Sequence, residues 1–117
     1  MGIVEVESSE IKVVEVVMAR VVNVYKEPFT MYIGRKNPKF GAGSKFANKK
    51  CIGKDGTREE VIAGYREWLW KEIKNGNITI KELQNMKDEV FGCFCKPQQC
   101  HGDVLVAAVE WAMTQET

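Results

Sequence analysis

A nine-residue segment at positions 93–101 (CFCKPQQCH) contains three of the chain's four cysteines and its only histidine. Cysteine and histidine supply nucleophiles, proton carriers and metal ligands near neutral pH. The pattern predicts a strand up to Cys95, which would place Cys93 and Cys95 on one face, and Pro97 then interrupts it. An apolar periodic stretch follows at 104–113. Any chemistry of this protein is therefore expected at a junction between a strand and a helix.

Three uses of this segment follow from its expected place at a helix N-terminus, where unpaired N–H groups and the helix dipole stabilise anions. The helix end could bind phosphate, with His101 and Asp103 orienting the ligand. It could instead activate the Cys100 thiol, which makes Cys100 and His101 the catalytic candidates if the protein is an enzyme. Zinc bound by Cys93, Cys95, Cys100 and His101 is the third use, although adjacent ligands at 100 and 101 count against it. Otherwise the cysteines are simply buried residues and His101 helps to cap the helix.

A second group of polar residues lies between positions 35 and 56, where the hydrophobic pattern disappears. Loops longer than about 12 to 15 residues are uncommon inside compact domains and are often functional. Arg35, Ser44 and Lys45 offer a guanidinium, a hydroxyl and an ammonium beside flexible glycines, which suits an anionic ligand. Asn23 and Asn48 could read a base or ribose edge, or could satisfy backbone groups and turns. The spacing is that of neither a Walker loop nor a dinucleotide-binding fingerprint.

Composition narrows the class of protein. The chain has 117 residues, 44% of them hydrophobic, which is enough for one domain with a core that needs no disulfides. A formal net charge of +1 gives no global basic footprint, so nucleic acid is a disfavoured partner. No apolar stretch is long enough for a membrane span, and residues 1–17 do not resemble a secretion signal. We expect a cytoplasmic protein with reduced thiols and no membrane partner.

The hydrophobic pattern also predicts the elements that position these residues. We expect a hairpin from strands at 3–6 and 11–17, with Ser8 and Ser9 near its turn, and further strands at 20–25, 31–34 and 88–95. A helix should begin at the capping box formed by Thr57 and Glu60 and end at 75–76, a shorter one should span 78–86, and a last one should follow His101. Trp70 cannot share a helix face with Trp68, and an exposed tryptophan indicates a homo-oligomer interface.

The predicted fold is a single small α/β domain over residues 1–117, with a mixed sheet of about four to five strands and about three helices. Residues 1–19 form an N-terminal strand or hairpin extension to a region at 20–117. Several segments of that region resemble, in order, those of DUF4326, an uncharacterised family of phage and microbial proteins: 20–24 (RVVNV), 32–35 (YIGR), 43–48 (GSKFAN), 55–59 (DGTRE), 65–69 (YREWL), 92–97 (GCFCKP) and 100–105 (CHGDVL). The Cys-His ending is also similar to an element of the uncharacterised family DUF488. These resemblances imply phage association but no particular activity.

Ligands of α/β domains gather outside the carboxyl ends of strands, and both polar segments leave strands there. We therefore expect a small-molecule-binding domain, encoded by a phage, for a nucleotide-like or phosphorylated ligand, without a cofactor. Alternatives are a nucleotide-processing or thiol-dependent enzyme that uses Cys100 and His101, and a phage interaction protein that sequesters a host signal nucleotide or blocks a host protein. The expected ligand-binding residues are Asn23, Arg35, Ser44, Lys45, Asn48, Cys95, Cys100, His101 and Asp103.

Overall fold

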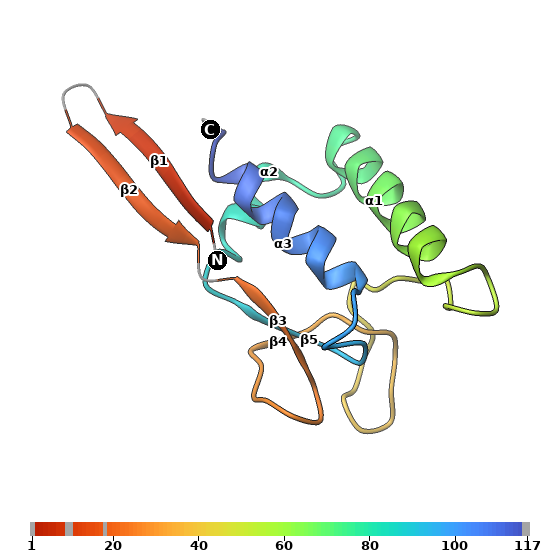
Figure 1. The fold of residues 1–117 in the computed structure, drawn as a ribbon. Helices are drawn as coiled ribbons and strands as arrows, with labels where there is room; N and C mark the ends of the chain where they lie inside the picture. The colour runs from red at the N-terminus through yellow and green to blue at the C-terminus, as the bar shows by residue number, and fades with distance from the viewer. Residues whose placement is uncertain (1, 9–10, 18, 116–117) are drawn as a thin grey trace.

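The strands in the described part of the chain form two separate sheets (Figure 1). The computed structural model describes residues 2–8, 11–17 and 19–115. Strands β1 (Gly2–Ser8) and β2 (Ile11–Val17) make an antiparallel hairpin. Strands β3 (Arg20–Asn23), β4 (Met31–Tyr32) and β5 (Val90–Cys93) make a parallel sheet in the order β3-β5-β4. The N-terminal hairpin is therefore confirmed, although Ser9 at its expected turn lies outside the described residues.

The prediction of one mixed sheet with four to five strands is wrong. The described part of the chain has a three-stranded sheet in which both pairings are parallel. The hairpin strands pair with each other along their whole length, from Gly2 opposite Val17 to Ser8 opposite Ile11, instead of joining β3. Central strand β5 is flanked by β3 on one side and by the two-residue β4 on the other. An alternating sequence shows that a segment is a strand but leaves its partner open.

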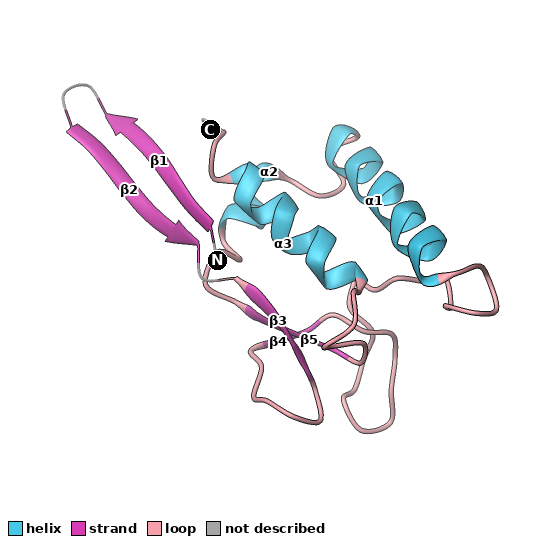
Figure 2. Cartoon of the chain, in the orientation of Figure 1, coloured by secondary structure: helices cyan, strands magenta, loops and turns pink. Residues whose placement is uncertain are grey.

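Three helices complete the described fold (Figure 2): α1 (Arg58–Lys74), α2 (Ile80–Gln84) and α3 (His101–Ala112). The capping box of α1 is confirmed, because Thr57 Oγ1 accepts a hydrogen bond from the Glu60 amide and the Glu60 carboxylate accepts one from the Thr57 amide. Helix α2 is shorter than expected, and α3 begins at His101 itself. Strand β5 ends at Cys93, so Cys95 lies in the turn after the strand and not on its face.

Helix α3 lies between the sheet and α1, and it also packs against α2 (Figure 1). Its buried residues include Leu105 and Val109, which belong to the same hydrophobic cluster as Leu69 of α1. The N-terminus of α3 approaches the sheet at Gly102, where an added Cβ would lie 2.8 Å from both Val21 methyl carbons. A glycine at this position therefore lets α3 dock with His101 at the sheet's carboxyl edge.

Within the described ranges, no helix combines the length and the apolar character that crossing a membrane requires. The tryptophan at position 70, which we expected at a subunit interface, is half-buried against Trp111 with a ring-centroid distance of 4.8 Å.

Candidate functional site

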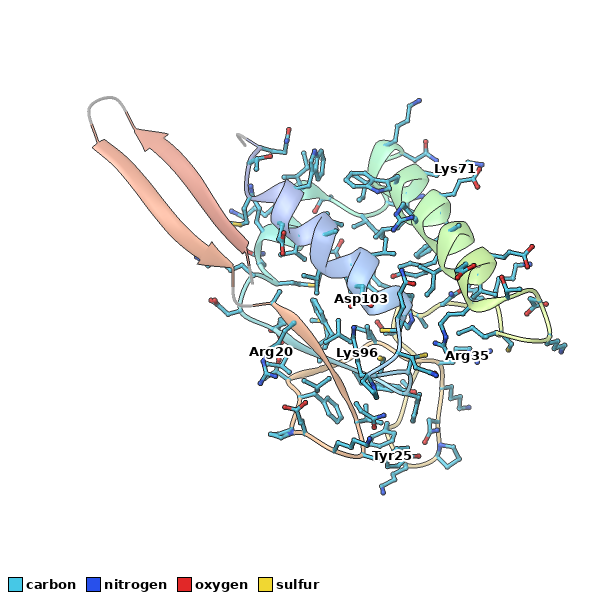
Figure 3. The ribbon with its side chains drawn as sticks, viewed as in Figure 1. Arg20, Tyr25, Arg35, Lys71, Lys96 and Asp103 are labelled. Carbon is cyan, nitrogen blue, oxygen red and sulfur yellow. The ribbon has the colours of Figure 1, made fainter. Side chains whose placement is uncertain are left out.

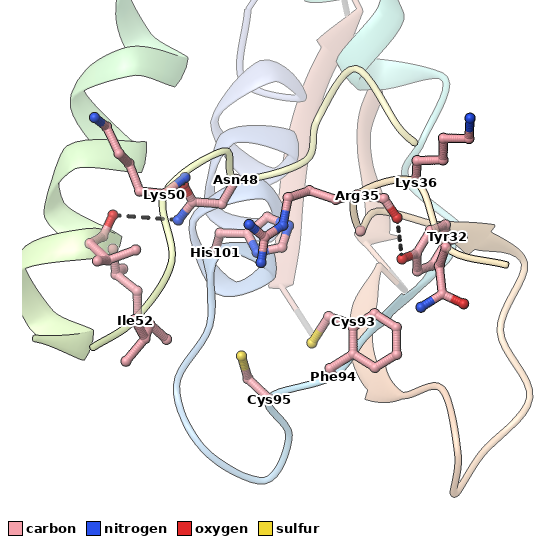
Figure 4. Close-up of a pocket in the computed structure, with 14 residues that line it drawn as sticks. Tyr32, Arg35, Lys36, Asn48, Lys50, Ile52, Cys93, Phe94, Cys95 and His101 are labelled. Atoms are coloured by element: carbon pink, nitrogen blue, oxygen red, sulfur yellow. Dashed lines mark hydrogen bonds between the residues drawn. The ribbon is translucent and has the colours of Figure 1, made fainter. Parts of the chain in front are cut away.

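A cavity of about 480 Å³ opens where β4 and β5 end (Figure 4). Its size lies within the range of small-molecule sites, about 300 to 1,000 Å³. Its walls come from the segments that leave the two strands, from the long loop, from α1 and from the first residue of α3. The described lining residues are Tyr32, Gly34, Arg35, Lys36, Asn37, Asn48, Lys50, Ile52, Val61, Ile62, Cys93, Phe94, Cys95 and His101. The cavity thus occupies the edge at which α/β domains bind ligands.

The described charged side chains that line the cavity are all positive. Arg35, Lys36 and Lys50 are exposed cations at the cavity, and no carboxylate is among the described lining residues. Apolar lining comes from Ile52, which lies on the same side as Lys50, and from the first turns of α1 (Figure 4). A positively charged cavity with an apolar wall is suited to a ligand that combines an anionic group with an uncharged body.

His101 is held at the back of this cavity by one hydrogen bond. Its Nε2 donates to the carbonyl oxygen of Ile33 at 2.9 Å, and its ring meets the edge of the Tyr65 ring at a centroid distance of 4.9 Å. Burial lowers the pKa of His101 from its ordinary value of 6.5, and the positive charge of Arg35 lowers it further. The imidazole is therefore neutral near pH 7, and because a carbonyl only accepts, the proton is on Nε2 and Nδ1 is an acceptor.

The end of β4 positions Arg35. The Tyr32 hydroxyl donates to the Arg35 carbonyl oxygen at 2.6 Å, and a Cβ on Gly34 would collide with the Tyr32 ring. This bend directs the Arg35 side chain across the cavity, where its Nη1 donates to the Cys51 sulfur at 2.7 Å. The guanidinium keeps further donors for a ligand, because arginine has five N–H groups.

The three cysteines of the segment 93–101 are not equivalent. Cys93 and Cys100 are buried, at 1% and 0% exposure, and their sulfurs lie 3.1 Å apart. This sulfur contact is the main cause that lowers the pKa of Cys100 and raises that of Cys93. Cys95 is half-buried at the cavity, and a hydrogen bond with the Cys93 thiol is the main cause that raises its pKa. Cys95, the accessible thiol at the cavity, is therefore protonated at pH 7, whereas Cys100, the thiol with the lowered pKa, is enclosed.

Cys100 and Asp103 hold the N-terminus of α3, and Figure 3 shows Asp103 there with its partner Lys96. The Cys100 amide donates to Asp103 Oδ2 at 3.1 Å, and Lys96 forms an ion pair with Asp103 Oδ1. Neither Cys100 nor Asp103 is among the described residues that line the cavity. They shape the turn from which Cys95 and His101 reach it.

The four residues considered for zinc do not converge on one point. In the described part of the chain, no group of three or more His, Cys, Asp or Glu side chains could hold a metal ion. Nε2 of His101 is directed at Ile33, while the Cys93 and Cys100 sulfurs face each other. This arrangement does not fit the tetrahedral set that a structural zinc ion requires.

The structure brings together four of the nine expected ligand-binding residues, which are Arg35, Asn48, Cys95 and His101. The side chain of Asn23 donates to the carbonyls of Phe94 and Lys96 and so fixes the turn after β5. The hydroxyl of Ser44 accepts from the Phe46 amide. Lys45 points to α2, where its Nζ lies 2.9 Å from a carboxylate oxygen of Glu82. These three side chains, like Cys100 and Asp103, support the fold around the cavity.

Sequence reasoning missed several residues of the cavity, namely Lys36, Lys50, Ile52 and Phe94. Ile52 and Phe94 did carry a signal, because each is a large hydrophobic residue in a segment rich in polar residues. The two lysines carried none, because the same loop has four others and only the fold decides which of them face the cavity.

Comparison with known proteins gives two matches. Residues 16–111 match the model of the family described as a domain of unknown function, DUF4326. Over 93 residues, the chain is 37% identical to the uncharacterized 12.4 kDa protein in the nrdA-td intergenic region of Enterobacteria phage T4. The aligned residues cover 79% of this chain and 78% of that protein. No solved structure matches. The first resemblance noted in the sequence is thus confirmed, whereas similarity to DUF488 is not shown.

Proposed function

We propose that this chain, which belongs to the DUF4326 family, is a small-molecule-binding domain that holds a nucleotide-like or phosphorylated ligand in the cavity at the ends of β4 and β5. One observation carries the proposal: three cations and no carboxylate are among the described residues that line the cavity. Its phage T4 relative agrees with a phage context for the chain.

Three cations away from the cavity provide a comparison. Arg20, Lys45 and Lys96 each lie within ion-pair distance of a carboxylate. At the cavity, by contrast, Arg35 is held by a thiol, and the lining offers no acid to Lys36 or Lys50. Uncompensated cations around a concave surface favour an anion, and arginine grips phosphate with two parallel hydrogen bonds.

Binding is favoured over thiol-dependent turnover. A thiol catalyst needs a thiolate that the substrate can reach. Cys100 has the lowered pKa but is fully enclosed, and Cys95 faces the cavity with a raised pKa. His101 uses the nitrogen that carries its proton on a backbone carbonyl. Cys95 and His101 are therefore suited to line the wall of a ligand-binding cavity and not to react with a substrate.

Isothermal titration calorimetry with adenosine 5′-monophosphate and ribose 5-phosphate tests the proposal. Arg35→Gln and Lys50→Gln should each weaken binding by about tenfold, because each removes a charge-assisted contact worth about 1.5 kcal/mol or more. Lys54→Gln is the matched control, since Lys54 is an exposed lysine of the same loop that does not line the cavity. Failure of both probes to bind, or equal loss in all three variants, would contradict the proposed site.

Native mass spectrometry of protein purified from cells without chelator adds an independent measurement. A retained mass that matches a nucleotide, and that is lost in Arg35→Gln, would support the site and identify a cellular ligand. The same spectrum reports the oligomeric state, and a retained mass that survives Arg35→Gln would place the ligand elsewhere.

A further inference from the structure

Exposed hydrophobic side chains gather at the mouth of the cavity. The large hydrophobic residues with the greatest exposure in the described chain are Tyr25, Phe94 and Ile52, at 63%, 41% and 40%. Phe94 and Ile52 line the cavity, and the ring of Tyr25 lies 5.7 Å from that of Phe94. Single exposed apolar residues are ordinary, but their concentration at one opening marks a contact surface.

Neighbouring rings hold the Phe94 ring in place. Its centroid lies 5.7 Å from that of Phe40 and 6.0 Å from that of Tyr32, both in edge-to-face arrangements. These contacts fix the ring from behind, yet two-fifths of the residue stays exposed. An aromatic side chain that is immobilised and still accessible loses little entropy when a flat group stacks on it.

The two walls of the mouth face a common space. Phe94 enters from the end of β5 and Ile52 enters from the loop beside α1, with Arg35 and His101 between them at the back (Figure 4). A planar aromatic group can lie against the Phe94 ring while its polar edge faces the acceptor and donors behind. A sugar phosphate has no planar apolar part with which to cover these two residues.

We propose that Phe94 and Ile52 form a nucleobase subsite, so that the ligand is a nucleotide whose base lies against Phe94 while its phosphate faces Arg35 and Lys50. This inference rests on the proposed function, because the phosphate anchors the ligand in the same cavity. It narrows the ligand class from phosphorylated molecules in general to nucleotides. The nucleotide can be free or can be the terminal unit of a single strand.

The first experiment compares inorganic phosphate, ribose 5-phosphate and adenosine 5′-monophosphate by calorimetry. The intact protein should bind the nucleotide at least about tenfold more tightly than ribose 5-phosphate, because stacking of one base contributes roughly 1 to 3 kcal/mol. Phe94→Leu should remove this preference and leave ribose 5-phosphate binding unchanged, whereas Phe94→Trp should keep the preference. Ile52→Ser is a second variant from the opposite wall and should reduce the preference in the same direction.

Tyr25→Leu is the matched control, because Tyr25 is an exposed aromatic beside Phe94 that does not line the cavity. It should leave mononucleotide binding unchanged. The same variant also distinguishes a free nucleotide from the end of a single strand. The Lys39 ammonium lies 5.1 Å from the centroid of the Tyr25 ring, so that ring and cation together could bind a second nucleotide of a strand. If the ligand is the end of a single strand, the dinucleotide pApA should bind more tightly than the mononucleotide, and Tyr25→Leu should remove that gain in affinity. If the ligand is a free nucleotide, pApA should bind no more tightly than the mononucleotide.

The outcomes distinguish the two proposals. If the mononucleotide and ribose 5-phosphate bind equally, and both weaken in Arg35→Gln but not in Phe94→Leu, the anion site stands and the base subsite is overturned. If none of the probes binds the intact protein, both proposals fail. Thermal melting of each variant shows whether a loss of binding reflects unfolding, and the exposure of Phe94 and Ile52 makes folded variants the expected result.

Discussion

His101 Nε2 donates a hydrogen bond to the main-chain oxygen of Ile33 at 2.9 Å, and this contact joins the first residue of α3 to the segment that leaves β4. The bond consumes the only ring proton of a neutral imidazole. His101 is therefore committed to holding the back wall of the cavity, and its protonation state affects the stability of the fold.

The free energy of unfolding should fall as the pH drops below about 6.5. The pKa of His101 is lower in the folded protein than its ordinary value of 6.5. Between these two values the unfolded chain binds a proton that the folded chain excludes, so stability rises with pH up to about 6.5 and then levels off. The slope in that window should be positive and stay below about 1.4 kcal/mol per pH unit, which is the limit for one titrating group. Urea denaturation at pH 5.5, 6.5 and 7.5 measures it.

His101→Gln provides the control for that slope, because its amide can still donate to Ile33 but does not titrate. The variant should show a flatter profile between pH 5.5 and 6.5. Glu60, whose pKa is lowered by hydrogen bonds with Thr57, contributes at lower pH and is unaffected by the change. An unchanged slope in His101→Gln would assign the pH dependence to other groups.

Two glycines in helices should respond to alanine in opposite ways. A Cβ on Gly102 would lie 2.8 Å from the Val21 methyl carbons, so Gly102→Ala should lower the free energy of unfolding by about 1 to 3 kcal/mol through overpacking. Gly64 in α1 is exposed and has nothing within 4 Å of the new methyl group. Gly64→Ala should therefore raise it by about 1 kcal/mol through helix propensity. Thermal or urea denaturation of the two variants checks both signs.

Local features of the fold could be predicted from the sequence. The capping box at Thr57 and Glu60 depends on residues three positions apart, and the structure has both of its hydrogen bonds. Three helices and the hairpin follow from periodicity in the same way. The sheet could not be predicted, because β3 and β4 pair with β5 across some 60 to 70 residues of chain and alternation alone names no partner.

The candidate site likewise has a part that local sequence predicted and a part that depends on contacts between distant segments. Arg35 and His101 were expected at the cavity because Arg35 follows a strand that ends at the sheet's carboxyl edge and His101 begins a helix that starts there. Lys45 was also expected there, but its ammonium group forms an ion pair with Glu82 of α2 instead of lining the cavity. Lys50, which was not expected, lines the cavity. Cys100 is enclosed because Gly102 lets α3 dock closely on Val21. Such tertiary contacts decide where a side chain points and how deeply it is buried, and neither property can be predicted from residue type and spacing alone.

Alkylation should separate the cysteines into two classes. Cys51 and Cys95 are half-buried and should react with iodoacetamide in the native protein, Cys95 more slowly because its raised pKa keeps the thiol protonated. Cys93 and Cys100 are enclosed, at 1% and 0% exposure. If their modification requires global unfolding of about 5 kcal/mol, they should react slower than in the unfolded chain by between about three and four orders of magnitude. Peptide mass spectrometry after timed alkylation gives the four rates, and 6 M guanidinium should make them similar. Rapid native modification of Cys100 would restore it as a candidate nucleophile.

The response of nucleotide binding to salt and pH should show which groups hold the phosphate. Affinity for adenosine 5′-monophosphate should fall by about tenfold between 0.05 M and 0.5 M NaCl, because exposed cations at the cavity are screened, while adenosine should show no such loss. Affinity should rise from pH 5 to pH 7.5, because the phosphate gains its second charge near pH 6 and is then attracted more strongly to the cations of the cavity. A phosphate bound by protonated His101 would give the opposite trend, with tighter binding at low pH. Calorimetry at three pH values therefore decides between an anion site made by the loop cations and one made by the histidine at the start of α3.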